Sequence, residues 1–291
     1  MHYTQVKTIL SAKNGMNLYR GCSHGCIYCD SRSKVYNMQH QFEDIEVKSN
    51  AIELLEKALK GKRKKCMIGM GSMTDPYIPL EQEIQNTRKA LELIYKYGFG
   101  ATLITKSSSI LRDLDILKAI NSKTKCVIQM TLTTFDEKLC KILEPNVSST
   151  KERFETLKIL KENNIPTVVW LTPILPFIND TKENLTGILE YCIKAKVYGI
   201  ICFGLGLTLR EGNREYFYEK LDKYFLQLKE KYIKTYRMNY ILNSPNNNYL
   251  MNIFYKTCKQ HNIIYDNNDI FQYLSTFESK EIAEEVQPEL F

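Results

Sequence analysis

The sequence predicts an α/β protein whose six parallel strands and their helices form a partial (β/α)6 TIM-like barrel with N- and C-terminal extensions. Short apolar runs alternate with segments of helical periodicity after residue 50, and capping signals mark several helix starts. The 291 residues, 44% of them hydrophobic, suffice for one large core. Because a strand followed by a helix usually leads to a parallel neighbour, this order favours an open or partial barrel over an antiparallel sandwich.

The six expected strands are apolar runs with polar or glycine-containing boundaries. The first is short and directly precedes a cysteine-rich segment, and each later strand is separated from the one before it by a helical segment. In chain order the strands cover residues 17–20, 66–70, 101–105, 127–132, 167–171 and 199–205.

Helix starts are marked by capping-box pairs, in which a polar side chain precedes a glutamate by three residues. Periodic apolar residues continue the pattern, and Gly98 ends the second helix. The expected helices cover residues 50–59 with the pair Asn50 and Glu53, then 84–94 and 110–120, then two that open at Ser149 with Glu152 and at Asp180 with Glu183.

The chain shows no internal repeat and no low-complexity linker. We expect residues 1–243 to form the core domain, with the functional motif on a loop at residues 21–30. The stretch after Asn243 is more polar and irregular, and it includes three consecutive asparagines at 246–248. Residues 244–291 are therefore expected to be a C-terminal extension that closes one end of the barrel.

Composition restricts the class of protein. The sequence has no run of about 18 apolar residues and no secretory signal, so we expect a cytoplasmic protein without membrane contact. Nine cysteines, an odd number, argue against a disulfide framework and for a soft-metal site. The net charge of +7 is compatible with a polyanionic partner but does not identify one.

The motif that carries the chemistry lies at residues 21–29, which read Gly-Cys-Ser-His-Gly-Cys-Ile-Tyr-Cys. Cys22, Cys26 and Cys29 place three thiolates in one loop, and glycines at positions 21 and 25 permit tight bends. Three protein ligands leave one metal position open, which is typical of a catalytic site.

A zinc site is the main alternative for this motif. It would need His24, or a distant residue such as His40, as the fourth ligand, and the sequence contains no second CxxC pair. The other six cysteines fall mostly among apolar neighbours, where a thiol packs as a small hydrophobe. We therefore expect no second cluster.

The CxxxCxxC pattern with an aromatic residue before the last cysteine resembles the radical S-adenosylmethionine (SAM) superfamily. Residues 17–30, Asn-Leu-Tyr-Arg-Gly-Cys-Ser-His-Gly-Cys-Ile-Tyr-Cys-Asp, are similar to the branch related to spore photoproduct lyase. Segments 70–77, 105–107 and 143–145 extend the resemblance over nearly the whole chain. Within that branch it looks closest to the radical SAM mobile pair proteins.

The resemblance implies that Cys22, Cys26 and Cys29 hold a [4Fe-4S] cluster whose open iron binds the amino and carboxylate groups of SAM. An electron from flavodoxin or ferredoxin would then cleave the sulfonium to methionine and a 5'-deoxyadenosyl radical, which takes a hydrogen atom from the substrate. The cofactor supplies the reactivity, while the protein positions and shields the reactants.

Several residues at expected strand ends, where barrel active sites form, are candidates for SAM binding. A hydroxyl of Ser72 or Thr74 would accept from the SAM ammonium group, and Lys106 would pair with the SAM carboxylate. Thr131 or Thr133 would meet the ribose. Because side chains alternate along a strand, we expect one of these two to point inward.

Neighbouring residues complete the expected site. Tyr28 would present its ring and its backbone amide near the adenine, with Pro173 as an apolar wall. Asp75 is a candidate for bonding local amides beside a proline, and Glu144 is either a helix-end residue or, as the resemblance implies, part of the active face.

The sequence gives the least information about the substrate. Spore photoproduct lyase repairs a thymine dimer, and the resemblance implies a cysteine beside the SAM-binding serine as its hydrogen donor. The matching position here is Met73, whose thioether cannot return a hydrogen atom as a thiol does. We therefore do not expect dimer repair by that route, while DNA or a nucleotide stays open as the substrate.

The tail from Gln287 to Phe291 resembles the bacterial sliding-clamp peptide, a glutamine followed by an apolar pair that fills a hydrophobic groove. Docking of this tail on its own barrel is the alternative. Two other functions stay open: an iron–sulfur redox sensor that does not cleave SAM, and a zinc-stabilised nucleic-acid-binding protein.

Overall fold

The computed structural model describes residues 1–280, and its main sheet contains six strands that are all parallel. The spatial order is β2-β5-β6-β7-β8-β9, so each new strand is added beside the previous one, as in a partial barrel. The predicted fold class is confirmed. The strands are β2 (Gly15–Met16), β5 (Met67–Met70), β6 (Gly100–Thr105), β7 (Cys126–Thr131), β8 (Thr167–Trp170) and β9 (Gly199–Ile201).

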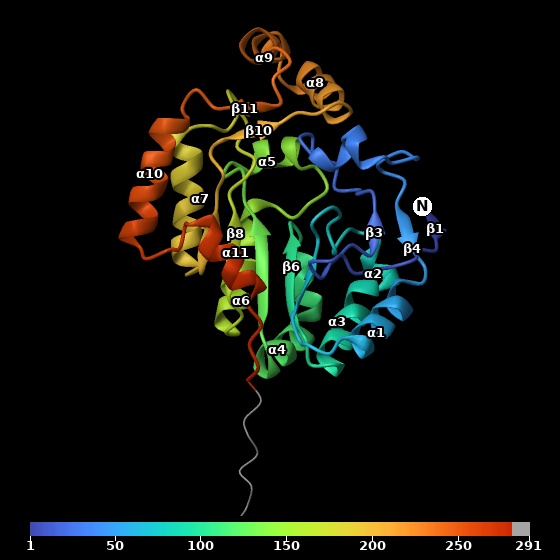
Figure 1. The fold of residues 1–291 in the computed structure, drawn as a ribbon. Coiled ribbons are helices and arrows are strands. Elements are labelled where there is room, and N and C mark those ends of the chain that lie inside the picture. The colour runs from blue at the N-terminus through green and yellow to red at the C-terminus, as the bar shows by residue number, and fades with distance from the viewer. Residues whose placement is uncertain (281–291) are drawn as a thin grey trace, which may run out of the picture.

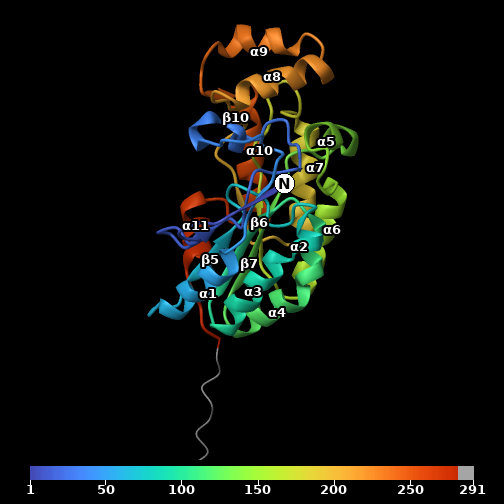
Figure 2. The ribbon, with the colours of Figure 1, turned by 90° about the vertical axis from the view of Figure 1, so that its right-hand side faces the viewer.

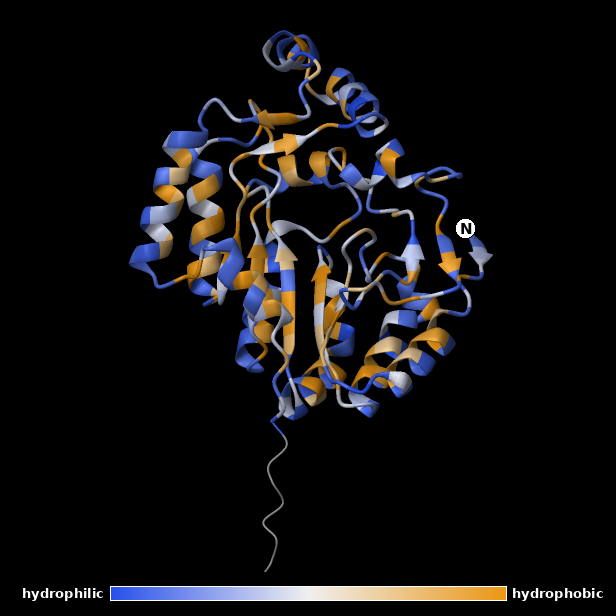
Figure 3. Ribbon diagram, viewed as in Figure 1, coloured by the Kyte–Doolittle hydropathy of each residue, from blue (hydrophilic) through white to orange (hydrophobic). Residues whose placement is uncertain are grey.

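Helices cover the outer face of this sheet, and the arrowheads of its strands point up toward α5 (Glu137–Leu143), β10 (Gly206–Thr208) and β11 (Ile241–Asn243) in Figure 1. The strands are largely apolar, whereas the surrounding helices carry mixed apolar and polar faces (Figure 3). The barrel helices are α1 (Ala51–Gly61), α2 (Glu81–Ile84), α3 (Asn86–Lys96), α4 (Leu114–Lys123), α5 (Glu137–Leu143), α6 (Thr150–Glu162) and α7 (Lys182–Lys194), with short 3-10 turns at Asp30–Arg32, Lys34–Tyr36 and Ser108–Asp113.

Two smaller sheets flank the main one. The first, in the order β1-β4-β3, lies beside the cysteine loop, and the second pairs β10 with β11 beyond the carboxyl ends of the main strands. Helices α8 and α9 lie above β10 in both views (Figures 1 and 2). The bounds are β1 (His2–Thr4), β3 (Tyr19–Arg20), β4 (Glu46–Lys48), β10 (Gly206–Thr208), β11 (Ile241–Asn243), α8 (Asn213–Tyr224) and α9 (Leu228–Tyr236).

The inner face of the sheet is filled in two layers. A hydrogen-bonded layer crosses three strands, because Gln129 donates to Thr102 at 2.8 Å and accepts from the Trp170 indole at 2.7 Å. An apolar layer joins Val127 and its neighbours on β8 and β9 to Ile270 of α11. The last helices are α10 (Asn247–Gln260) and α11 (Asn267–Ser275). Whether an extension begins at residue 244 stays a prediction.

The expected first strand at residues 17–20 is wrong in detail. The first strand of the main sheet is β2, and Tyr19–Arg20 instead pairs antiparallel with β4 in the small sheet. Asn17 stands at the change of direction, where its side-chain oxygen accepts from the Met73 amide at 3.0 Å. The expected last strand also ends early, at Ile201, because the Asn267 side chain binds both the amide and the carbonyl of Cys202.

One of the three expected capping boxes forms. Ser149 and Glu152 bond each other's backbone at the start of α6, as predicted. Asn50 makes no cap bond, because its side chain is bound to both backbone groups of Val6 on a distant segment. The helix expected at Asp180 opens instead at Thr181, whose hydroxyl accepts from the Asn184 amide.

Two expected helices are divided. Gln85, in the left-handed region at φ 56°, separates α2 from α3, and a 3-10 segment from Ser108 to Asp113 precedes α4. Within residues 1–280, no helix combines the length and the apolarity that crossing a bilayer would require. The cytoplasmic location stays a prediction.

Candidate active site

The cysteine loop follows β3, and backbone geometry fixes where it starts. Gly21 has φ 85°, and a Cβ at this position would lie 2.5 Å from the Phe42 carbonyl oxygen, so only glycine fits. That same carbonyl accepts a hydrogen bond from the Cys22 amide at 3.0 Å. The segment that returns to β4 therefore holds the first cysteine.

A second segment, residues 143–146, holds the rest of the loop. The Ile27 amide donates to the Leu143 carbonyl at 3.0 Å, and the Asn146 amide donates to the His24 carbonyl at 3.1 Å. The Asn146 side chain also donates to the carbonyl of Ser23 at 2.9 Å. A loop that has little secondary structure of its own is thus positioned by backbone bonds to the end of α5.

Glu144 connects this clamp to the barrel through a buried ion pair with Arg153 of α6, in which both side chains are fully buried. The Tyr28 hydroxyl donates to the same carboxylate. Burial raises the pKa of Glu144, but the Arg153 and Lys106 charges outweigh it, and the pKa lies below its usual value. Burial and the Glu144 charge raise the pKa of Tyr28 well above its ordinary range, so the phenol keeps its proton.

The three cysteines of the loop lie close enough for their charges to interact. Cys22 and Cys26 are buried and Cys29 is half-buried. Burial raises the pKa of the Cys22 thiol to about 12, and the nearby Cys29 adds to this rise. Burial likewise raises the pKa of Cys26, against the opposing charge of Lys106. Such thiols deprotonate when a metal replaces the protons, so the trio suits a positively charged inorganic group.

The spacing of the thiols bears on which group fits. Tetrahedral zinc with bonds of about 2.3 Å holds its sulfur ligands about 3.8 Å apart. Within residues 1–280, the set of three potential ligand atoms that lie within 4.8 Å of one another is His2, His40 and Asp44, not the cysteines. At least one pair of the three cysteine sulfurs is therefore more than 4.8 Å apart, which is wider than the sulfur spacing around one tetrahedral zinc ion.

Lys106 follows β6 and extends toward the loop. Its amine lies 5.9 Å from the centre of the Tyr28 ring, and within residues 1–280 no carboxylate forms an ion pair with it. Burial lowers the pKa of Lys106, but Cys26 and Glu144 outweigh this effect and the pKa is raised. The amine is therefore a cation with room for an anionic partner.

A cavity of about 440 Å³ opens beside these groups at the carboxyl ends of the strands. Tyr28, Cys29 and Lys106 line one side, and Pro173 lines a wall, as predicted for an adenine pocket. Its other lining residues include Phe203, Leu207 and Ile241, which come from the end of β9 and from the β10–β11 pair. The cavity thus combines predicted site residues with lining residues from β10 and β11 that the sequence did not predict.

The turn after β5 lies apart from this cavity. Thr74 and Met73 line a separate, smaller cavity of about 190 Å³, together with Gly21. Ser72 is exposed, and its hydroxyl accepts from the Asn17 side chain at 3.3 Å. The amide of Thr74 is also bound by Asn17, at 3.3 Å. Neither Ser72 nor Thr74 lines the cavity that contains Lys106.

Thr131 is the last residue of β7, and Thr133 lies beyond the end of the strand. Because residues two apart lie on the same face of a strand, alternation alone does not distinguish these two threonines. Thr131 has the same parity as Gln129, so it points to the inner face of the sheet, where it is buried. Thr133 is fully buried, and its hydroxyl donates to Glu144 at 3.3 Å. Neither lines the larger cavity. A role at the ribose stays a prediction for both.

Asp75 joins the strand ends to the cysteine loop. Its carboxylate accepts from the Tyr77 amide at 2.8 Å, the Thr105 hydroxyl at 2.7 Å and the Lys106 amide at 2.7 Å. His24 of the loop lies 3.5 Å from the same carboxylate. Burial lowers the pKa of His24, against the charge of Asp75. The structural interpretation of Asp75 fits these contacts.

Sequence reasoning missed three positioning residues: Asn17, Asn146 and Arg153. Asn17 and Asn146 each act on a segment far away in the chain, and neither has a local pattern that distinguishes it from a solvated polar residue. The signal for Arg153 was its place in the first turn of α6, where a cation opposes the helix dipole and needs a specific partner. The expected clamp-binding tail, 287–291, lies outside the described residues.

Comparisons with known proteins agree with this geometry. Residues 16–192 match the family model described as the radical SAM superfamily. An uncharacterized protein of Methanocaldococcus jannaschii is 34% identical over 177 residues, which is 60% of this chain and 65% of that protein. An uncharacterized protein of Acidianus two-tailed virus is 29% identical over 244 residues, 75% of this chain and 79% of that protein.

A third relative, the radical SAM Nα-GlyT isomerase of Pseudomonas phage M6, is 24% identical over 157 residues, 54% of this chain and 32% of that protein. The chain spans 65% of the length of the archaeal relative and 66% of that of an uncharacterized protein of Mycobacterium bovis. Coverage of these relatives is therefore partial.

Among solved structures, a variant of spore photoproduct lyase has a TM-score of 0.65 at 14% identity, over 90% of this chain and 78% of that one. A variant with bound AdoMet and dinucleoside spore photoproduct has a TM-score of 0.59 at 15% identity, over 86% and 74% of the two chains. At these identities the likeness shows a shared fold.

Proposed function

Because this chain belongs to the radical SAM superfamily, we propose that it is an enzyme that holds a [4Fe-4S] cluster on Cys22, Cys26 and Cys29 and cleaves SAM reductively. One observation carries the proposal: three cysteines, two of them buried and one half-buried, lie on one loop, and Cys29 of this loop lines a cavity together with Lys106. The placement within the mobile pair subgroup stays a prediction.

When bound, such a cluster supplies the electron that breaks the sulfonium carbon–sulfur bond of SAM, giving methionine and a 5'-deoxyadenosyl radical. The chain's own part is to hold the loop and to exclude water. Phe42 and residues 143–146 fix the loop backbone, and the β10–β11 pair covers the cavity. A radical formed there would be shielded from solvent until it met a substrate.

Within this proposal Lys106 binds the SAM carboxylate. Its amine is half-buried, carries a raised pKa and lines the cavity with Cys29. A half-buried cation that forms no ion pair with a carboxylate of residues 1–280 gains most from an anionic ligand, because the lowered dielectric strengthens their attraction. Tyr28, held through its hydroxyl by Glu144, would offer one face of its ring to the adenine. Ser72 and Thr74 are proposed for the ammonium group.

The substrate we propose is a nucleotide or DNA. Phe203, 63% exposed, lines the cavity and lies 6.2 Å, ring centre to ring centre, from both Trp170 and Phe271. An exposed aromatic group at a cavity mouth suits a planar base, which stacks without needing a specific hydrogen-bond pattern. The dinucleoside bound to the spore photoproduct lyase variant supports this class.

Partners are proposed on the same basis. A low-potential donor such as flavodoxin or ferredoxin would supply the electron, since the chain shows no second cluster motif. Gln287 to Phe291 would bind a sliding clamp if the substrate is DNA. Both proposals can be tested by co-purification and by electron-transfer assays with purified donors.

The decisive test of the cluster and of SAM binding uses two variants after anaerobic reconstitution. Cys26→Ala should lose both iron and the formation of 5'-deoxyadenosine. Lys106→Ala should keep the iron but weaken SAM binding by roughly 10-fold or more, the effect of losing one charge-assisted contact. Iron content, visible absorption and product formation with dithionite measure these outcomes.

Matched controls make the test specific. Cys66→Ala changes a half-buried cysteine outside the loop, and Lys118→Ala changes an exposed lysine of α4. Both should behave as wild type. Normal SAM cleavage by Cys26→Ala would refute the proposal, and a cluster without any cleavage would favour the redox sensor. One zinc per chain and no iron would favour the zinc-stabilised nucleic-acid-binding protein.

The substrate class has its own test, because Trp170 is the single tryptophan of the sequence and lies beside Phe203. Its fluorescence should respond when a short single-stranded oligonucleotide binds. Phe203→Ala should weaken this binding by roughly 1–3 kcal/mol, the value of one stacked base. Tyr249→Ala, which removes an exposed ring on α10, is the control. Equal affinity in the two variants would exclude stacking at Phe203.

A further inference from the structure

A third cavity, of about 340 Å³, lies at the amino ends of the main strands, and we call it the basal cavity. Its walls come from the segments that enter β7, β8 and β9, from α11 and from the chain that follows α11. The strand arrows point up in Figure 1, so these amino ends lie at the lower end of the barrel, away from β10 and β11. The basal cavity shares no lining residue with the larger cavity, so it is separate from the proposed SAM site.

Lysine dominates the charged lining of the basal cavity. Within residues 1–280, its charged lining residues are Lys125, Lys161, Lys196, Lys280 and one carboxylate, Glu278. Lys125 is 2% exposed and forms an ion pair with Glu278. The other three lysines form no ion pair with a carboxylate of the described chain. The Lys280 amine donates to the Asn121 carbonyl at 2.7 Å, and this neutral acceptor leaves its charge uncompensated.

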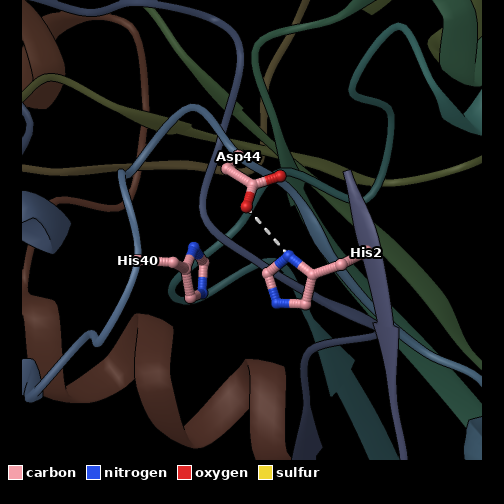
Figure 4. A group of neighbouring side chains, drawn as sticks. All are labelled: His2, His40 and Asp44. Atoms are coloured by element: carbon pink, nitrogen blue, oxygen red, sulfur yellow. Dashed lines mark hydrogen bonds and ion pairs between the residues drawn. The ribbon is translucent and has the colours of Figure 1, made fainter.

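A charged cluster beside β1 illustrates the contrast. Asp44 lies 2.9 Å from His2 Nδ1 (Figure 4) and 2.9 Å from the Met1 ammonium group. His40 of the same cluster lies 3.4 Å from the Glu46 carboxylate. Acidic and basic groups are paired there, whereas three lysines of the basal cavity lack an acidic partner among residues 1–280.

Helix ends alone do not account for these lysines. A cation is favoured in the last turn of a helix, and Lys161 occupies that position in α6. Lys196 lies beyond the end of α7, and Lys125 and Lys280 also lie outside helices. The helix dipole therefore does not explain three of the four lysines.

Basic residues continue along the amino ends of the neighbouring strands. The connection that enters β5 reads Lys-Arg-Lys-Lys at residues 62–65, and Lys123 precedes β7. We call these residues and the four lysines of the basal cavity the basic stripe. Adjacent strands from β5 to β9 are paired within two residues of their starts, so these ends lie level. At about 4.8 Å per strand the stripe spans about 19 Å, which equals about five or six nucleotide steps of a duplex strand at 3.4 Å.

We propose that the basic stripe binds the phosphodiester backbone of a nucleic-acid duplex, with phosphate groups at the basal cavity. A polyanion of even charge spacing suits lysines spread over several strands, because each phosphate contact releases condensed counterions. Such contacts recognise phosphate and not the base sequence. This inference rests on the proposed nucleic-acid substrate only for the class of ligand, and it needs neither the cluster nor SAM.

The test measures the fluorescence anisotropy of a labelled DNA duplex of about 20 base pairs, titrated with the full chain between about 50 and 200 mM salt. The logarithm of the affinity should fall linearly with the logarithm of the salt concentration. Lys161→Gln combined with Lys196→Gln should weaken binding roughly 10-fold at low salt and reduce the salt slope by about 2, one for each lost contact. A duplex of different sequence should give the same result, because the contacts are to phosphate.

Lys223→Gln combined with Lys234→Gln is the matched control, because both lysines are exposed on α8 and α9 at the other end of the barrel. This pair should bind the duplex as the parent does. Phe203→Ala should also leave duplex binding unchanged, because a duplex keeps its bases stacked inside, so the base-stacking proposal can fail while this one holds. Melting curves establish that each variant is folded.

Three outcomes would overturn the proposal. The first is an unchanged affinity and salt slope in the folded variant that lacks Lys161 and Lys196. The second is an equal loss of affinity in the control pair, which would show attraction spread over the whole surface. The third is saturable binding of inorganic phosphate without binding of the duplex, which would identify a site for a small anion.

Discussion

Replacing Glu144 by Gln tests how the cysteine loop is held. The Glu144 and Arg153 side chains are both fully buried, so the variant leaves the guanidinium charge without its carboxylate. Breaking such a pair costs about 3–5 kcal/mol. Arg153 keeps its bonds to the carbonyls of Thr131 and Ser148, each at 2.8 Å, which favours the lower end, about 3 kcal/mol. That is a large share of the roughly 5–15 kcal/mol that stabilises a typical folded protein.

The assay is equilibrium unfolding of the cluster-free chain in guanidinium chloride with a reductant, followed by Trp170 fluorescence and by circular dichroism. Glu190→Gln is the matched control, because Glu190 pairs with Lys194 on the surface of α7 and should contribute less than about 0.5 kcal/mol. The Glu144 variant should also bind less iron on reconstitution. A loss of stability below about 1 kcal/mol would refute the view that this ion pair holds the clamp.

Three more tests concern the charge of Glu144, the backbone at Gly21 and the cap of α6. The pKa of Glu144 is lower in the folded than in the unfolded protein, so its contribution to stability is present above the unfolded pKa of about 4.3 and is lost as pH falls through the folded pKa. The difference in unfolding free energy between wild type and Glu144→Gln should therefore shrink in acid. A difference that stays constant with pH would contradict this. Gly21→Ala should lower the free energy of unfolding by about 1–3 kcal/mol and reduce iron content, because its Cβ would clash with the Phe42 carbonyl. Gly61→Ala is the control and should be tolerated, because a Cβ there has open space. Ser149→Ala removes a cap that does form and should cost about 1 kcal/mol in denaturant unfolding; no change would mean that the cap is not needed.

The fold class and the cysteine loop could be predicted because both depend on patterns of residues that are close in sequence. Alternating strands and helices imply a parallel sheet whatever the later tertiary contacts are. Three cysteines within eight residues lie near one another in any compact loop. The box at Ser149 was predictable for the same reason, since its partner is three residues away. Lys106 was predictable as a strand-end residue once β6 was located.

Two of the failures involve a distant partner that outcompetes the local one. Asn50 has the sequence of a cap, but Val6 offers it two backbone bonds across the small sheet. The strand expected to run through residues 199–205 stops when Asn267, from α11, takes both polar groups of Cys202. No local sequence pattern predicts these contacts, because they form between segments that come together only when the chain folds.

The way the loop is held has a consequence for how the site is assembled. Phe42, Asp75 and the end of α5 each approach the loop from a different part of the barrel, and all three contacts are present in the chain's own backbone and side chains. Because these contacts position the loop backbone through the protein's own groups, we expect that iron and sulfide bind with little refolding of the loop. The opposing cost is the burial of thiols whose pKa values lie above the ordinary range, and it is relieved when metal replaces their protons. Loading should therefore release protons while leaving the far-ultraviolet circular dichroism unchanged, in contrast to a metal site that folds around its ion.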